Sequence, residues 1–204
     1  VRFKKKFDIN QYKYVVCDEF HYFANDDFNK YTDLSYEYIL NAKQSIKIFM
    51  SATSKFISNY LNNVSGIKTI DYVIPEDFSF IEKLEFFYND KTLDEYIEQA
   101  YQDNQKTMFF MKLNKALEYH FKYKDVSLFN CSKSRKESKH IDKDKIDEVL
   151  ENERFDCLFL FTTTCMDAGL NIKDDELVNI VVDVGTDLDT VIQCIGRKRL
   201  TETS

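Results

Sequence analysis

Short runs of apolar residues recur along the chain without the strict alternation of a half-exposed strand. They are rich in β-branched and aromatic side chains and fall at residues 14–17, 46–50, 107–111, 126–129, 157–161 and 178–184. Continuous apolar runs of this length are typical of strands that are covered on both faces. The pattern therefore predicts mainly parallel β-sheet.

Amphipathic helical segments lie between these runs. One of them starts at Thr92, where a T-x-x-E pattern predicts a capping box and apolar residues recur at helical spacing. Similar segments begin at Asp142 and at Thr186. Because strands and helices alternate, we expect an α/β architecture built from βαβ units.

The single proline, Pro75, interrupts this pattern and predicts a domain boundary. We place the boundary between two domains at residues 1–78 and 79–204. The composition, 44% apolar and 31% charged, is that of a globular protein. No run approaches the roughly 18 apolar residues of a membrane span, and the first residues lack the apolar stretch of a secretion signal, so we expect a cytoplasmic protein with no membrane partner.

Charge and cysteine content limit the possible functions. The net charge of −7 argues against a broad electrostatic surface for nucleic acid, so any such contact should be local. Two basic segments, 2–6 and 133–140, are candidates for phosphate contacts, although charged runs are most often solvated surface. The five cysteines include no C-x-x-C pair, which argues against a disulfide framework or a zinc site.

Candidate chemistry begins where the run 14–17 ends, at Asp18, Glu19 and His21. Ligands of open α/β sheets bind outside the carboxyl ends of the strands, where these side chains would lie. Taken alone, D-E-x-H is a short pattern that also fits a polar loop. Three more segments follow it in order: "IFMSAT" at 48–53, "FTTTCMDAGLNI" at 161–172 and "QCIGRKR" at 193–199.

In this order and in these strand-end or helix positions, the four segments resemble motifs II, III, V and VI of the superfamily 2 helicases and translocases, the DExH-type motors. The resemblance covers nearly the whole chain. It implies two RecA-like parallel-sheet lobes, the first truncated at its N-terminus and the second nearly complete. It also implies ATP and Mg²⁺ as nucleotide and cofactor, and nucleic acid as the partner, with DNA favoured over RNA.

The resemblance implies roles for individual residues. Asp18 would hold Mg²⁺, with Glu19 as a second candidate ligand, and Glu19 would polarise the attacking water. Arg197 would act as the arginine finger, because its planar, permanently charged group suits a bidentate phosphate contact. ATP would lie between the acidic pair of the first lobe and this arginine of the second.

Further candidates follow from the same motifs. His21 would link the acidic pair to Ser51, Thr53 or Gln193. The coupling residues would be Ser51, Ala52 and Thr53; the nucleotide-binding residues would be Gly169, Asn171 and Gly196; and Thr163 and Thr164 would contact nucleic acid. The segment "KTMFFMKLNKA" resembles motif IV and adds Lys112 and Asn114 as nucleic-acid contacts, although a solvated surface position also fits Lys112.

The chain departs from the family in two places. The last arginine of motif VI is expected at the position of Leu200, whereas Arg199 stands one residue earlier and becomes the second catalytic candidate. No glycine precedes residue 18, so the sequence lacks the phosphate-binding loop G-x-x-x-x-G-K-[ST] upstream of the DExH segment. We therefore expect part of a longer ATP-dependent helicase or translocase, inactive in hydrolysis by itself.

Two other functions remain open. The chain could be a non-catalytic, helicase-like module that binds nucleic acid or a partner. It could also be a metallonuclease built on Asp18, Glu19, His21, Asp26 and Asp27, although that interpretation leaves the three later segments unexplained.

Overall fold

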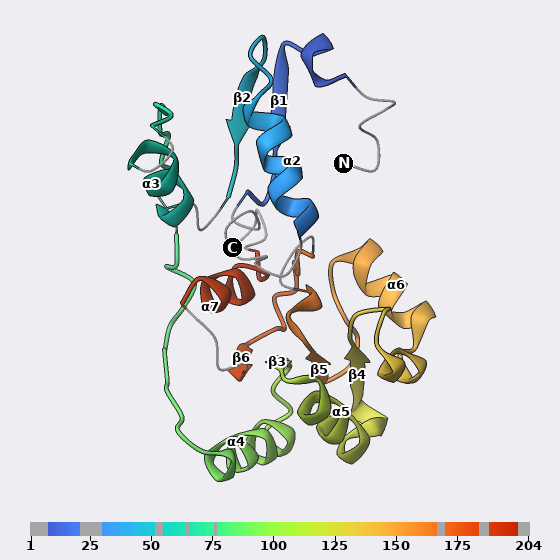
Figure 1. The fold of residues 1–204 in the computed structure, drawn as a ribbon. Helices are drawn as coiled ribbons and strands as arrows, with labels where there is room; N and C mark the ends of the chain where they lie inside the picture. Colours follow the sequence, from blue (N-terminus) through green and yellow to red (C-terminus); the bar gives the residue numbers. More distant parts are fainter. Residues whose placement is uncertain are drawn as a thin grey trace. The chain divides into compact units, whose positions relative to one another are not determined.

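The computed structural model describes residues 8–20, 30–51, 55–63, 66–75, 77–166, 170–183 and 188–199. The chain divides into two compact units, Val1–Pro75 and Glu76–Ser204, called here the N-terminal unit and the C-terminal unit. Figure 1 gives the labels of their helices and strands. Both units contain parallel β-sheet and α-helices, so the predicted α/β class is confirmed.

The N-terminal unit is built around two parallel strands. Its described elements are the 3-10 helix η1 (Ile9–Gln11), β1 (Tyr14–Cys17), α2 (Lys30–Leu40), β2 (Ile46–Phe49) and α3 (Lys55–Asn63). Tyr14 pairs with Ile46 at one end of the ladder and Cys17 with Phe49 at the other. Beyond the ladder, Phe20 is buried and stacks on Phe49, with 4.2 Å between the ring centroids.

One face of this small sheet is exposed. Tyr14 and Val16 of β1 and Ile46 and Ile48 of β2 share that face and are 41–56% exposed. The prediction that both faces are covered is therefore wrong for these two strands as described. The apolar run shows that the surface is suited to burial, but the described residues cover only the other side.

The C-terminal unit contains a four-stranded parallel sheet in the order β4-β5-β3-β6 (Figure 1). The strands are β3 (Thr107–Met111), β4 (Ser127–Asn130), β5 (Phe159–Thr162) and β6 (Asn179–Asp183). The helices are α4 (Asp90–Gln102), α5 (Leu113–Lys122), α6 (Lys143–Asn152) and α7 (Leu188–Ile195), with short 3-10 helices η2 (Lys124–Val126), η3 (Lys136–His140) and η4 (Thr164–Met166).

Every residue of the central strands β3 and β5 is buried. Successive side chains of β3 enter two different cores: Phe109 and Met111 pack with α4 and α5, whereas Met108 and Phe110 pack with α6 and α7. Phe109 also stacks on Phe161, with centroids 4.7 Å apart. Helices thus cover both faces of this sheet, which confirms the prediction of doubly covered strands here.

The helix starts were predicted with mixed success. The capping box at Thr92 is wrong, because α4 begins at Asp90 and the Asn89 side chain accepts the hydrogen bond from Thr92 N at 2.9 Å. The predicted helix start at Asp142 is confirmed, since Asp142 is the N-cap of α6 and its Oδ1 accepts from Lys145 N at 3.2 Å. Thr186 lies outside the described residues. No helix in the described ranges is long and apolar enough to cross a membrane.

Regular secondary structure is absent from residues 66–75 and 77–89. The boundary that we inferred between residues 78 and 79 falls in this segment, and the two compact units divide after Pro75. Ile70, Tyr72 and Val73 are more than 80% exposed there.

Candidate functional site

Asp18 and Glu19 form a turn directly after β1. Asp18 is exposed and its Oδ1 accepts a hydrogen bond from Glu19 N at 2.9 Å. Glu19 has a φ of 48°, in the left-handed region that non-glycine residues adopt uncommonly. The next residue, Phe20, anchors the turn through its buried ring. The carboxylates therefore lie at the carboxyl end of the strand, as the sequence predicts.

The segment after β2 lies against this turn. Met50 N donates to Cys17 O at 2.9 Å, and Phe20 N donates to Met50 O at 3.0 Å. These bonds bring Ser51, which is half-buried, to the same edge of the sheet as the acidic pair. His21, Ala52 and Thr53 lie outside the described residues, as do Asp26 and Asp27. Two of the four motif segments thus meet in the N-terminal unit.

Mg²⁺ is the metal that the resemblance implies for the acidic turn. Mg²⁺ takes oxygen ligands, keeps several waters and commonly uses one or two carboxylates beside substrate phosphates. An exposed carboxylate at a strand end, as in Asp18, meets that need. No group of three or more His, Cys, Asp or Glu residues that could hold a metal occurs in the described part of the chain.

Three strand ends of the C-terminal unit share one edge. Asn130 of β4 pairs with Thr162 of β5, and Thr162 pairs with Phe110 of β3. Thr163 and Thr164, both half-buried, follow β5 directly, and the exposed Lys112 follows β3 at the N-cap of α5. The sequence-predicted nucleic-acid contacts after β3 and β5 therefore lie at the same edge.

A cavity of about 980 Å³ opens at the start of α5. Lys112 and Asn114 line it, and so do Arg135 and Lys136 from the basic segment 133–140. Lys115 adds a fourth positive charge, and four acidic residues in the lining balance these charges: Asp90, Asp94, Glu118 and Glu137. The cavity is therefore not selective for anions by charge alone.

Two of the lining residues form a tight pair between helices. Tyr119 Oη donates to Asp94 Oδ1 at 2.6 Å. Burial, together with the neighbouring Asp94 carboxylate, raises the pKa of Tyr119 above its ordinary value. The phenol therefore keeps its proton and serves as a donor that ties α5 to α4.

The arginine-containing segment follows α7, and Arg197 is buried within the unit, only 7% exposed. Its Nε donates to Gln193 O at 3.0 Å, its Nη1 to Leu170 O at 3.1 Å and its Nη2 to Gln193 Oε1 at 3.2 Å. A side chain on Gly196 would come within 3.2 Å of Ile192 O, so this close turn favours glycine. Gln193 itself is 5% exposed.

Arg199, in contrast, is exposed, and its Nε donates to Asn171 Oδ1 at 3.0 Å. The backbones of the two segments also pair: Ile172 N donates to Arg197 O at 2.7 Å, and Arg199 N donates to Ile172 O at 2.9 Å. The segments 161–172 and 193–199 therefore meet in the C-terminal unit. Gly169 lies outside the described residues.

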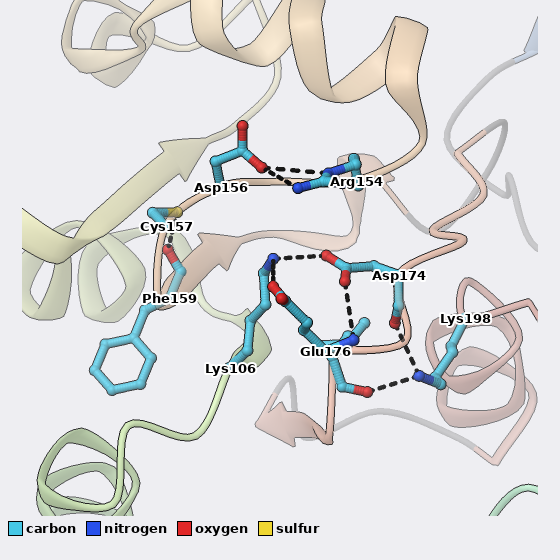
Figure 2. A network of polar contacts seen from close by, with 9 residues as sticks. Lys106, Arg154, Asp156, Cys157, Phe159, Asp174, Glu176 and Lys198 are labelled. Atoms are coloured by element: carbon cyan, nitrogen blue, oxygen red, sulfur yellow. Dashed lines mark hydrogen bonds and ion pairs between the residues drawn. The ribbon is translucent and has the colours of Figure 1, made fainter.

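A partly buried polar network supports this pairing (Figure 2). Lys198 Nζ donates to Asp174 O at 3.1 Å and to Leu177 O at 2.7 Å. Lys106 Nζ lies 2.7 Å from Asp174 Oδ2 in an ion pair between two buried side chains, and Asp174 Oδ1 accepts from Glu176 N at 3.0 Å. No sequence pattern pointed to this ion pair: Lys106 opens the segment "KTMFFMKLNKA" but has no role assigned there, and Asp174 lies outside the motif segments.

Comparison with protein-family models, with curated proteins and with solved structures finds no significant match to this chain. The motif segments and the geometry described above are therefore the features that bear on function.

Proposed function

We propose that this chain is part of an ATP-dependent helicase or translocase of the superfamily 2 type, with two RecA-like lobes. The observation that carries the proposal is the pairing of the motif segments. The Asp18–Glu19 turn is hydrogen-bonded to the segment that carries Ser51, and residues 161–172 are hydrogen-bonded to residues 193–199. Segments that are distant in sequence but act together in such motors are thus in contact within each unit.

In the N-terminal unit, Asp18 would hold Mg²⁺ and Glu19 would orient the attacking water. Mg²⁺, when bound, would neutralise charge on the phosphates. The left-handed backbone of Glu19 is compatible with a functional role, because such conformations cost on the order of 1–3 kcal/mol and cluster at functional sites, but Asn104 and Glu153 adopt it as well. Ser51 would couple this site to the rest of the motor.

In the C-terminal unit, Thr163 and Thr164 would contact the phosphate backbone of nucleic acid at the strand edge, with Lys112 and Asn114 beside them. Contacts of this kind position a strand without reading its sequence. An arginine of the segment 193–199 would act on the nucleotide, with Asn171 and Gly196 in the same region and with Gln193 as a buried support of that segment. We propose DNA rather than RNA as the nucleic acid.

The phosphate-binding loop would be supplied elsewhere in the same motor, since the sequence contains no G-x-x-x-x-G-K-[ST]. On this proposal the 204-residue chain binds nucleic acid but does not hydrolyse ATP. Hydrolysis requires the polypeptide encoded by the complete open reading frame around these residues, called here the full-length protein.

The test measures ATP hydrolysis by the purified full-length protein with and without DNA. We expect DNA to stimulate hydrolysis, and Glu19→Gln to lower the turnover number by about 10²-fold or more while ATP is still bound. Glu37→Gln is the matched control, because Glu37 is an exposed glutamate of the same unit and should leave turnover unchanged. Normal turnover in the Glu19→Gln protein would remove the role of Glu19, and absence of stimulated hydrolysis in the wild type would refute the motor.

The missing phosphate-binding loop also favours a second function, a non-catalytic module that binds nucleic acid. This alternative predicts that the full-length protein binds DNA at the strand edge without any hydrolysis. Loss of binding in a Lys112→Ala, Thr163→Ala double variant, together with absent hydrolysis, would support the module and exclude the motor.

A further inference from the structure

The two arginines that follow α7 are in opposite environments. An arginine that stabilises charge on a transferred phosphoryl group must offer its terminal N–H groups to phosphate oxygens. All three nitrogens of Arg197 already donate to oxygens of Gln193 and Leu170 inside the C-terminal unit. Arg197 would have to abandon these buried acceptors to reach a nucleotide, and a buried acceptor left without a donor is costly.

Arg199 does not face this conflict. Its side chain is exposed, and its bond to Asn171 uses the single donor at Nε. A guanidinium has five N–H donors, so this bond through Nε does not use either terminal NH₂ group. A guanidinium held through Nε presents its terminal groups as a fork, which is the arrangement that a bidentate phosphate contact needs.

The backbone that carries Arg199 is also held firmly. Lys198 and Ile172 form a parallel bridge. The Lys198 ammonium is bonded to the carbonyls of Asp174 and Leu177, and Asp174 is in turn paired with Lys106 (Figure 2). Such support limits the positions that the exposed guanidinium can take.

We propose that Arg199, and not Arg197, is the arginine that contacts the nucleotide phosphate, that Asn171 is a positioning residue, and that the role of Arg197 is structural. Asn171 orients the Arg199 guanidinium through Nε, and Arg197 joins the end of α7 to Leu170, next to Asn171. This assignment rests on the proposed motor function.

The test uses the full-length protein and compares kcat and KM for ATP with thermal stability. We expect Arg199→Ala to lower kcat by about 10³-fold with KM and the melting temperature close to wild type, and added guanidinium at non-denaturing concentration to restore part of the activity. Arg197→Met should instead lower the melting temperature by several degrees. Arg154→Ala is the control, because Arg154 is an exposed arginine of the same unit that also uses its Nε in a side-chain bond.

The positioning role of Asn171 has its own readout. Asn171→Ala should lower kcat by about tenfold or more with little change in KM, since the fork is still present but no longer oriented. Asn171→Asp keeps an acceptor oxygen for Nε and should recover most of that loss, which a merely structural role for Asn171 would not produce.

The outcomes separate this inference from the motor itself. A wild-type protein without DNA-stimulated hydrolysis defeats the proposed function. An active wild type in which Arg199→Ala keeps full kcat, or in which Arg197→Met loses kcat at an unchanged melting temperature, defeats the assignment of the arginines and leaves the motor standing.

Discussion

Replacing Lys106 by methionine should destabilise the C-terminal unit far more than a surface substitution of the same kind. Lys106 and its partner Asp174 are 8% and 6% exposed, and their charged atoms lie 2.7 Å apart. Methionine fills nearly the same volume, so the packing over the Phe155 ring, 4.9 Å from the Lys106 ammonium, is largely kept. The substitution removes the Lys106 ammonium. Among the described residues, this is the only positive charge in an ion pair with the buried Asp174 carboxylate.

The magnitude follows from that uncompensated charge. Removing one partner of a buried ion pair costs about 3–5 kcal/mol. Asp174 Oδ1 still accepts from Glu176 N in the variant, so we expect the lower end of the range, about 3 kcal/mol. For a domain of this size that loss lowers the melting temperature by roughly 10 °C. In urea it moves the unfolding midpoint by about 1.5–2 M.

The assay is urea unfolding followed by far-UV circular dichroism, because the chain has no tryptophan to report by fluorescence. Lys83→Met is the matched control: Lys83 lies 2.8 Å from Glu85 in an ion pair whose side chains are 74% and 62% exposed. That variant should lose less than about 0.5 kcal/mol, since exposed pairs contribute little. Adding Asp174→Asn to Lys106→Met should recover at least half of the loss, because the neutral amide no longer buries a charge.

A Lys106→Met variant that loses no more stability than Lys83→Met would refute this reasoning. Equal stability of the single variant and the double variant would also count against it, because it would show that the Asp174 charge is not the source of the cost.

Two further predictions concern titrating groups. Burial, and after it the positive charges of Lys124 and His140, lower the pKa of His120, whose Nδ1 lies 2.9 Å from Ser127 Oγ. The folded state then binds the proton more weakly than the unfolded state, so the free energy of unfolding should be fully present above the ordinary histidine pKa of about 6.5 and fall as the pH drops below it. Urea titrations at several pH values should show that His120→Gln flattens this fall, and an unchanged slope would contradict the prediction. Burial also raises the pKa of Cys157 to about 11, so at pH 8 iodoacetamide should label it about a hundredfold more slowly than in the urea-unfolded chain, as peptide mass spectrometry can measure; equal rates would rule out the burial effect.

The strand positions were largely predictable because burial imposes a local requirement. A strand covered on both faces needs an apolar side chain at each position, and the predicted run 107–111 coincides with β3. The same signal in 14–17 and 46–50 identified β1 and β2, but half of their side chains are exposed in the described structure. An apolar run shows that a surface is suited to burial and does not show what covers it.

For the candidate site, the sequence predicted only which residues lie at strand ends. Asp18 and Ser51 follow neighbouring parallel strands, so their meeting at one edge follows from the order of apolar runs and polar residues. The cap of α4 was not predictable in the same way: Thr92 matched a capping box, yet Asn89 supplies the cap, because Asn and Thr side chains can both cap a helix.

By itself, then, the sequence determined the α/β class, the places of the strands and the order of the motif segments, since each depends on the properties of neighbouring residues. The tertiary structure alone decided which of two arginines separated by one residue is buried and which is exposed. It also decided that Lys106 neutralises Asp174 and that Lys198 is held by the same loop. Those outcomes depend on contacts between segments that only the folded sheet brings together, and no local pattern encodes them.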